Sequence, residues 1–540
     1  MRLLLILILA YGVLFAKSKD TCYSVQLTSF VKKKGSTYSF EKQNYPESCK
    51  IFKFSNMNAV RCGCFKRYSD AKKQKKVFSA AYNASLIVKT YSYRFAPKKS
   101  LAKQKQSTKV VIPVIPKKVT QEIVVKDEVP AENIAPAVND SFAFMEDVVI
   151  QGNVNMQFQK YITRPDGKHA NNYTASAELE AAYNKDDFKA FAQFRAQQDY
   201  YDLQGGSDHN DRSYLRINEL YAQYDFEDSQ VLFGKSVRFW GALEVHNLTD
   251  GFNIRDFRSD PTDNDKVGSW NGAYTLFTDS GEISFIAKFN EENRKMPAFT
   301  YVYYPFTNQQ VTYDSDVKTE ESKNRPSIYI KYSGSTDTDY ALDYAIIFEN
   351  GYDSQRYYNL PTTPNYKVNE NAYLVNKLMT YNTLVVGSTL YKLEAVYADV
   401  KDDNNIADYY SLGLGMEHTL TQIYNEADLG LLLEYYKYDT INPNSNNYDD
   451  LDLFETFQND IFVGFRYSFN EGNDASIVGG GIFDIDYNEE VYYVEYEGRI
   501  NDMFKLNLDY RQTEPSISHK TALNRMGKQK RVSVKVGYYF

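Results

Sequence analysis

The feature that most constrains the fold of this 540-residue chain is a two-residue alternation of apolar and polar side chains. It recurs from about residue 142 to the end, as in FKLNLDYRQ at 504–512 and RVSVKVGYYF at 531–540. This period is typical of β-strands that turn one face to an apolar environment and the other to water. The 48 Tyr and 33 Phe residues also favour strands. After the N-terminus no apolar run approaches the roughly 18–20 residues of a spanning helix, which excludes a helical membrane protein.

The alternating segments predict about 18 strands. Their joins are short and long in turn: NKDD, EDS and DSGE are short, whereas 241–266 and 292–325 are long. A sandwich would need Greek-key crossings and would not sort its connections in this way. We therefore expect a mostly β protein with an antiparallel, up-and-down transmembrane β-barrel over 142–540. The predicted strands lie near 146–163, 172–184, 187–201, 213–226, 229–240, 267–278, 281–291, 326–334, 339–352, 371–387, 389–400, 408–420, 426–439, 460–470, 474–487, 491–500, 503–514 and 528–540.

The N-terminal part has a different composition. Residues 1–16, MRLLLILILAYGVLFA, have the layout of a secretory signal peptide, with a buried strand as the alternative. Residues 97–141 are rich in Pro and Lys and predict an extended linker. Between 17 and 138 there are 25 Lys and Arg against 8 Asp and Glu, a charge of about +17. The remainder, from 139 onward, has a charge of about −26.

All four cysteines, Cys22, Cys49, Cys62 and Cys64, lie in the segment 20–96. CYSVQL, NAVRCGCF and SLIVKTYSYRF read as strands, and SDAKKQKKVFSAAYN between the last two reads as a helix, which predicts a small α/β domain. In an exported domain we expect disulfides. Cys62 and Cys64 are expected on one strand face and too far apart to bridge each other, so each pairs with Cys22 or Cys49, and both connectivities stay open. No spacing among them matches a zinc site.

Within this segment, YSVQL at 23–27 and VRCGCF at 60–65, before a helix containing Asp70 and Ala71, resemble the SPOR domain. The resemblance implies a first helix after residue 30, although KKKGSTYSFEK is a poor helix former. It also implies binding of peptidoglycan glycan strands on the exposed sheet face. The candidate residues are Gln26, Arg61, Tyr91 and Tyr93. The alternative is that these are ordinary residues of a sheet surface.

The end of the chain, VSVKVGYYF at 532–540, resembles the aromatic-ended last strand that outer-membrane barrels present to the bacterial barrel-assembly machinery. The resemblance implies the outer membrane of a Gram-negative-type cell, with outer-membrane lipid and that machinery as partners and the N-terminal domain in the periplasm. Aromatic residues near strand ends, such as Tyr161 and Tyr224, suit the girdles at the membrane interfaces.

About 18 strands enclose more space than wall side chains can fill, which predicts a water-filled channel unless loops plug it. Charged residues on the polar face of the predicted strands would line this channel. The alternative for each is mutual neutralisation inside the wall. The candidate pore-lining residues are Glu178, Glu180, Lys189, Arg195, Asp343, Glu349, Lys392, Glu394, Glu434, Arg466, Glu495, Glu497, Arg499, Lys505, Asp509 and Arg511.

One long join stands out, FGKSVRFWGALEVHNLTDGFNIRDFRSDP at 233–261, which contains one of only two Trp residues. It resembles the Trp-Gly then Asp-x-x-Asn-x-x-Asp stretch of alginate-export-like and related porin-like outer-membrane barrels. The resemblance implies a constriction inside the barrel. The alternative is a structural loop pinned by Arg–carboxylate pairs. The candidate constriction residues are Arg238, Trp240, Asp250, Asn253, Arg255, Asp256 and Arg258.

Enzyme functions have little support, because only His418 of the five His residues falls in a predicted strand and no nucleophile–His pair is evident. No phosphate-binding loop or metal-ligand cluster is present in the sequence, so we expect no cofactor or metal. The basic N-terminal part could attract nucleic acid, but its expected location outside the cytoplasm favours anionic wall polymers or lipid head groups instead. The sequence thus predicts a porin-like channel for passive diffusion of small hydrophilic solutes or ions, tethered to peptidoglycan. The alternatives are a structural envelope tether or surface protein with a plugged barrel, and a polysaccharide export channel. Neither a solute nor an oligomeric state follows from the sequence.

Overall fold

The computed structural model describes most of the chain from residue 21 onward. The described residues are 21–31, 46, 48–53, 57–66, 68–79, 86–91, 148–205, 209–260, 265–306, 311–337, 341–359, 367–401, 406–424, 427–441, 456–470, 473–519 and 521–540. The predicted signal peptide and linker lie outside these residues. No helix in the described part is long and apolar enough to cross a membrane.

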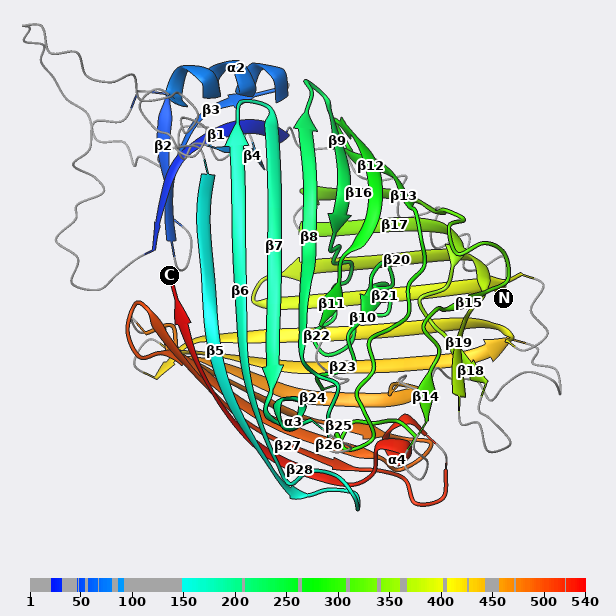
Figure 1. The fold of residues 1–540 in the computed structure, drawn as a ribbon. Helices are drawn as coiled ribbons and strands as arrows, with labels where there is room; N and C mark the ends of the chain where they lie inside the picture. Colours follow the sequence, from blue (N-terminus) through cyan, green and yellow to red (C-terminus); the bar gives the residue numbers. More distant parts are fainter. Residues whose placement is uncertain are drawn as a thin grey trace, which may run out of the picture.

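The C-terminal region is a closed antiparallel barrel of eighteen strands, as predicted (Figure 1). All but one of its neighbouring pairs are consecutive wall strands, and the pair of the last with the first closes the wall. The strands are β5 (Val148–Thr163), β6 (Asn171–Lys185), β7 (Phe188–Asp199), β8 (Tyr214–Asp225), β9 (Ser229–Ser236), β12 (Ser269–Thr278), β13 (Gly281–Lys288), β16 (Ser327–Asp337), β17 (Ala341–Tyr352), β20 (Leu374–Val386), β21 (Thr389–Val400), β22 (Asp408–Tyr424), β23 (Ala427–Ile441), β24 (Asn459–Ser468), β25 (Ser476–Asp484), β26 (Glu490–Arg499), β27 (Phe504–Glu514) and β28 (Gln529–Tyr539).

The two ends of the chain's alternating region meet where the barrel closes. β28 pairs antiparallel with β5, and the backbone of Phe540 exchanges two hydrogen bonds with Gly152, of 3.0 and 3.1 Å. Closure leaves no unpaired strand edge for lipid to meet. The aromatic final residue is therefore part of the seam of the barrel.

Short turns and long loops gather at opposite ends of the strands, as the sequence predicts. Two residues join β6 to β7 and β12 to β13, whereas residues 237–268 join β9 to β12 and 289–326 join β13 to β16. The long loops add short elements that the sequence did not reveal. These are β10 (Ile254–Arg255), β11 (Lys266–Val267), β14 (Thr312–Tyr313), β15 (Lys318–Thr319), β18 (Tyr357–Asn359), β19 (Lys367–Ala372), α3 (Tyr200–Gln204) and α4 (Ala522–Met526).

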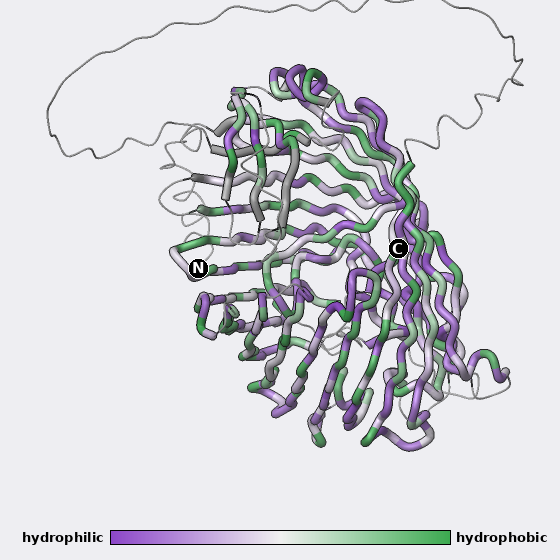
Figure 2. Tube along the Cα trace, turned by 90° about the vertical axis from the view of Figure 1, so that its left-hand side faces the viewer, coloured by the Kyte–Doolittle hydropathy of each residue, from purple (hydrophilic) through white to green (hydrophobic). Residues whose placement is uncertain are grey.

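The outer face of the wall is apolar, and green and purple alternate along its strands in Figure 2. On β28, Val532, Val534 and Val536 are 37–40% exposed, whereas Arg531 and Ser533 between them are buried. An apolar surface that encircles the molecule suits lipid rather than water. The expectation for Tyr161 as an interface residue was wrong. It is 2% exposed and faces the interior, because it shares a strand face with the inward residues of β5.

The small N-terminal unit is a four-stranded sheet with one described helix. Its elements are β1 (Thr21–Val31), β2 (Cys49–Lys53), β3 (Met57–Phe65), α2 (Tyr68–Ser79) and β4 (Leu86–Tyr91). The sheet order is β2-β3-β1-β4 with antiparallel neighbours, and α2 packs on it through buried Ala71 and Phe78. This order is that of a split β-α-β topology. The sequence predicted β1, β3, α2 and β4 but missed β2, and the expected first helix falls outside the described residues.

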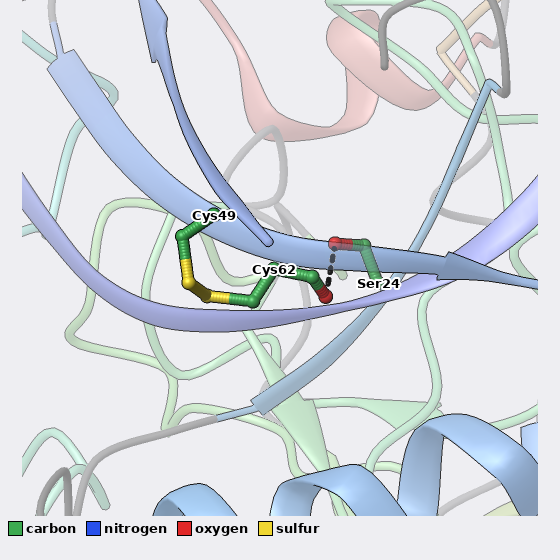
Figure 3. The surroundings of a disulfide bond; sticks show 3 residues. All are labelled: Ser24, Cys49 and Cys62. Carbon is green, nitrogen blue, oxygen red and sulfur yellow. Dashed lines mark hydrogen bonds between the residues drawn. A yellow bond between two sulfur atoms is a disulfide. The ribbon is translucent and has the colours of Figure 1, made fainter. Parts of the chain in front are cut away.

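The disulfide Cys49–Cys62 joins β2 to β3, beside the hydrogen bond from Ser24 to the Cys62 carbonyl (Figure 3). This bond is one of the pairings left open by the sequence, and Cys64 is also disulfide-bonded. The expected common strand face of Cys62 and Cys64 does not hold. Gly63 has φ +68°, and the register shifts here, because a bulge interrupts the alternation of β3.

The small unit contacts the barrel at the end that carries the short turns. Figure 1 shows α2 and its sheet beside the upper ends of β6 to β9. Lys72 of α2 forms an ion pair of 2.8 Å with Asp187, in the turn between β6 and β7.

Candidate functional site

The segment between β9 and β12, residues 237–268, folds into the barrel and is called the inward loop below. Glu394 on β21, fully buried, accepts hydrogen bonds from the backbone N–H groups of Leu243 and Thr249 at 2.9 and 3.1 Å. Glu434 on β23 accepts from the N–H of Glu244 at 2.8 Å. A loop inside a barrel has many backbone N–H groups without strand partners. These carboxylates accept hydrogen bonds from N–H groups that would otherwise be buried and unsatisfied.

Two glycines on β22 let the inward loop lie directly against the wall. A Cβ atom on Gly413 would stand 2.3 Å from the Leu243 side chain, and one on Gly415 would stand 2.9 Å from it. Both glycines occupy inward positions, as their pairing with Glu394 and Lys392 of β21 shows. The absence of side chains here creates the space that Leu243 fills.

Several predicted constriction residues hold the loop together rather than face open space. Trp240 is 4% exposed and packs edge-on against Phe252, with ring centroids 5.5 Å apart. Asp250 accepts from the Trp240 N–H and pairs with Lys266. The Asn253 side chain accepts from the backbone N–H of Arg238 at 2.7 Å and donates to two carbonyls of neighbouring strands.

The acidic residues of the second half of the loop are held by arginines. Arg258 donates to Asp256 from two nitrogens, at 2.8 and 2.6 Å, and Arg216 also pairs with Asp256. Burial alone would raise the pKa of Asp256, but these arginines outweigh it and the pKa is lowered. Arg238 donates to Asn271 at 2.8 Å.

Asp260 forms a second anchor, which the sequence analysis did not identify. Its carboxylate lies 2.7 Å from Arg511 and 3.0 Å from Arg531, and it accepts from the Tyr303 hydroxyl at 2.7 Å. Burial would raise the pKa of Asp260, but the two guanidinium groups reverse this and hold it well below its usual value. The anchor ties the inward loop and the β13–β16 loop to the wall.

Arg255 differs from the other predicted constriction residues. Within the described residues its side chain makes no ion pair or hydrogen bond with a protein group, and it borders an open cavity of about 80 Å³. This loop-side cavity, on the side of the long loops, is also lined by His246 and by four further cations, Lys288, Arg294, Arg356 and Lys377.

Of those four, three are matched by carboxylates: Lys288 and Arg356 share Glu291, and Lys377 pairs with Asp353. Arg294 donates to the Ser354 carbonyl at 2.6 Å. Among the described residues, none forms a hydrogen bond or ion pair with the Arg255 guanidinium, so this group can bind an anionic group in the cavity. The His246 ring stacks on the Phe457 ring, with ring centroids 4.7 Å apart. Burial, together with the nearby charge of Arg255, lowers the pKa of His246 to about 3.

A second open cavity, of about 500 Å³, lies on the other side of the inward loop, toward the short turns. Gly241 of the loop and the inward residues Glu282, Asp343 and Tyr381 line it. Tyr23 of the small unit completes it. The inward loop thus separates a loop-side cavity from this turn-side cavity.

The strand register places the predicted pore-lining residues on the inward face, where most are paired with one another or with the inward loop. Arg195 pairs with Glu178 at 2.5 Å and with Asp265 at 3.0 Å. The other contacts are Glu180 with Gln193, Lys189 with Asp225, Glu349 with Tyr329, Lys392 with Glu417, Arg466 with Glu244, Glu495 with Asn507, Glu497 with Lys505, Arg499 with Asp474, and Asp509 with Arg531.

The glycan-binding candidates are only partly described. Gln26 is 7% exposed and accepts a hydrogen bond of 2.9 Å from Arg61, so most of its amide is covered. The Tyr91 side chain and all of Tyr93 fall outside the described residues.

The sequence analysis missed Lys288, Lys377, His246, Arg294 and Arg356 as lining residues. The first two sit at inward positions of predicted strands, so alternation could have found them. The others are in loops, where no periodic signal exists. No group of three or more His, Cys, Asp or Glu side chains in the described chain is placed to hold a metal ion.

Comparison with known proteins gives similarity in fold only. No protein-family model matches the sequence, so the SPOR resemblance is not supported by one, and no curated protein matches either. Among solved structures, a BenF-like porin from Pseudomonas fluorescens Pf-5 is 10% identical, with 74% of this chain and 99% of that chain covered and a TM-score of 0.45. Pseudomonas aeruginosa OccK5 (OpdH) is 9% identical, with 74% and 99% covered and a TM-score of 0.43. OmpT of Vibrio cholerae is 10% identical, with 73% and 97% covered and a TM-score of 0.36.

Proposed function

We propose that this chain forms a narrow channel of the outer membrane for passive diffusion of small hydrophilic solutes or ions, and that it is not an enzyme. The observation that carries the proposal is the pair of open cavities on the two sides of the inward loop, inside a closed barrel. A solute would enter the loop-side cavity, pass the inward loop and leave through the turn-side cavity. The loop then sets the size limit.

The charges of the wall support selection at the inward loop rather than along the whole wall. Most inward acids and bases are matched at 2.5–4.0 Å, so their fields largely cancel. Arg255 supplies a positive charge that no described carboxylate neutralises. A charge at the narrowest point of a pore acts on every ion that passes it. We therefore assign Arg255 as the residue that biases the channel toward anions.

The rest of the chain has roles that follow from this location. We assign residues 1–16 as the export signal and 97–141 as a linker, and the β28 strand as the signal read by the barrel-assembly machinery. The small unit over 20–96 would lie in the periplasm and hold peptidoglycan. Its basic charge suits an anionic wall polymer, and its sheet order suits the SPOR-like domain proposed from its motifs.

Solute flux into liposomes tests the channel. The purified chain should admit a small neutral sugar and exclude larger oligosaccharides, with a sharp size limit set by the inward loop. A variant lacking 17–140 should keep the same size limit. Liposomes that stay impermeable to every solute with both chains would contradict the proposal.

A plugged barrel that serves as an envelope tether is the second candidate, because the interior is densely packed around Tyr301, Tyr436 and Phe462. Solute flux separates the two candidates, because both assign sacculus binding to the small unit. A tether without a channel sediments with purified sacculi and passes no solute. Loss of sacculus binding when 17–140 is removed supports the tether, whereas unchanged binding contradicts it.

A further inference from the structure

The short turns on one side of the barrel form an acidic surface. Turn and strand-end residues Asp186, Asp187, Asp225, Asp228 and Asp279 lie at this end of β6, β8, β9 and β12 and their turns, and are called the acidic rim below. Lys189 offsets one of them through a 2.8 Å pair with Asp225. The rim otherwise carries an excess of negative charge at the mouth of the channel.

The small unit meets this rim with the basic side of α2. The Lys72 ammonium lies 2.8 Å from Asp187 and donates to the Asp225 carbonyl oxygen at 3.1 Å. The Lys72 and Asp187 side chains are 19% and 24% exposed. Lys75 is partly buried in the field of the same two aspartates, whereas Lys73, on the same helix, is exposed.

The position of the sheet shows that the small unit stands over the mouth and not beside it. Tyr23 and Ile87 line the turn-side cavity together with Asp343 and Thr383, which face the interior of the barrel. Tyr23 also lies in the field of Asp228 and Asp279. One side of the cavity is therefore the channel wall and the other is the small unit.

We propose that the small N-terminal domain is a lid that docks on the acidic rim through Lys72 and covers the turn-side mouth of the channel. Partly exposed ion pairs at a surface are weak, each changing the docked-to-undocked ratio by up to about five-fold. Docking of this kind is reversible and weakens with salt, because the Debye length falls from ~10 Å at 0.1 M to ~3 Å at 1 M. A lid held in this way would open when the domain is drawn to another polyanion. The conduction part of the idea rests on the proposed channel, whereas the docking part does not.

Cross-linking tests the docking on the full chain. A zero-length carbodiimide joins an amine to a carboxylate in direct contact, so the native chain should give a Lys72–Asp187 product by mass spectrometry. High salt should reduce its yield. Lys73→Glu, which makes the same charge change on the exposed side of α2, should leave the yield unchanged. Absence of the product at low salt, or a yield that salt does not alter, would overturn the docking.

Single-channel recording tests the lid. At about 0.1 M salt, Lys72→Glu should raise the fraction of time in the high-conductance state several-fold, whereas Lys73→Glu should not. The exchanged pair Lys72→Asp with Asp187→Lys should restore native behaviour, which a merely misfolded domain would not. If all these chains spent the same fraction of time in the high-conductance state although the cross-link forms, the domain would dock without covering the channel. That result would overturn the proposal. If even the chain lacking 17–140 carries no current, the proposed channel fails, and the cross-link alone decides the docking.

Discussion

At the scale of single residues, the charged side chains inside this barrel are of two kinds. Some are paired and stabilise the fold, and others face open space. Asp256 and Asp260 are enclosed by arginines, and Glu394 by backbone donors. Removing such a group leaves its partners unsatisfied, which costs stability. Arg255 has no such partner among the described residues and borders the loop-side cavity. Its replacement should therefore affect passing ions more than folding.

Arg255→Glu should lower the anion-to-cation permeability ratio by up to about 100-fold at low salt. Exchanging a positive for a negative charge raises the energy of a univalent anion about 6 Å away in water by ~1.4 kcal/mol and lowers that of a cation by the same amount, so each contributes about ten-fold. The reversal potential across a salt gradient measures this ratio. Lys323→Glu, on an exposed part of the β13–β16 loop, makes the same charge change and should leave the ratio near native. If Arg255→Glu had the same anion-to-cation permeability ratio as the native chain, Arg255 would not be the residue that selects ions at the constriction.

His246 predicts an acid-sensitive inward loop. Its pKa is lowered from 6.5 to about 3, first by burial and then by Arg255. Between those pH values the unfolded loop binds more protons than the folded one, so stability is complete above about pH 6.5 and falls as the pH drops toward 3. The slope is at most ~1.4 kcal/mol per pH unit.

Thermal unfolding followed by Trp fluorescence at pH 7 and pH 5 measures this effect, since Trp240 lies in the same loop. The native chain should lose stability between the two values, and His246→Asn should lose less. Exposed His209→Asn serves as the control and should match the native chain. Equal losses in all three would rule out His246 as the cause.

Alternation in the sequence predicted which strand residues face the interior, because a period of two fixes the face of every residue in a regular strand. It could not predict what Glu394 or Arg511 contacts, because those partners belong to the inward loop, whose path follows no period. It also left the roles of Trp240 and Asn253 open. The structure places them in the loop's own packing.

At the scale of elements, the inward loop is a separate unit held to a wall that does not need it. The ladder of β21 with β20 and β22 is complete without the loop. The loop depends on the carboxylates of Glu394 and Glu434 and on the space above Gly413 and Gly415. Changes at these positions should therefore loosen the loop and leave the barrel folded.

Glu394→Ala should widen the channel. It removes the acceptor for Leu243 and Thr249, and each lost bond to a charged group costs about 1.5–3 kcal/mol of loop attachment. We expect a larger and noisier single-channel conductance with an unchanged β-sheet signal in circular dichroism. Glu497→Ala removes an inward acid that pairs with Lys505 and does not contact the loop, so it should conduct as the native chain does. A native conductance in Glu394→Ala would show that the loop is held elsewhere.

The disulfide Cys49–Cys62 should stabilise the small unit and not the barrel. It closes a loop of 13 residues in sequence, for which the chain-entropy account gives ~3 kcal/mol. Cys49→Ser with Cys62→Ser should make the small unit sensitive to limited proteolysis, while the barrel keeps its heat-dependent migration in gels. Equal protease resistance of both chains would mean that packing alone holds the sheet.

Elements with a strong period were the ones that could be predicted. The wall strands were found from the sequence because each repeats the same pattern over about ten residues. β2, β10, β11 and the small sheet of β14, β15, β18 and β19 were missed because strands of two to six residues carry too few alternations. Their positions depend on packing against other loops, as with Tyr304 and Phe306 against Tyr358.

At the scale of the whole molecule, the two parts of the chain carry opposite net charges and contact each other through an ion pair. The basic N-terminal part and the acidic remainder meet where Lys72 reaches Asp187. The charge division was visible in the sequence, but composition cannot say where two surfaces meet. Docking uses Lys72 of α2, whereas the candidate glycan-binding residues Gln26 and Arg61 lie on the sheet.

The central claim is that the closed wall encloses a continuous aqueous path past the inward loop. Conductance of the purified chain lacking 17–140 in a planar bilayer at about 1 M salt tests it most directly, because no lid remains under these conditions. We predict discrete unitary steps whose size increases in Glu394→Ala. A correctly folded barrel that inserts and gives no current steps would contradict the account.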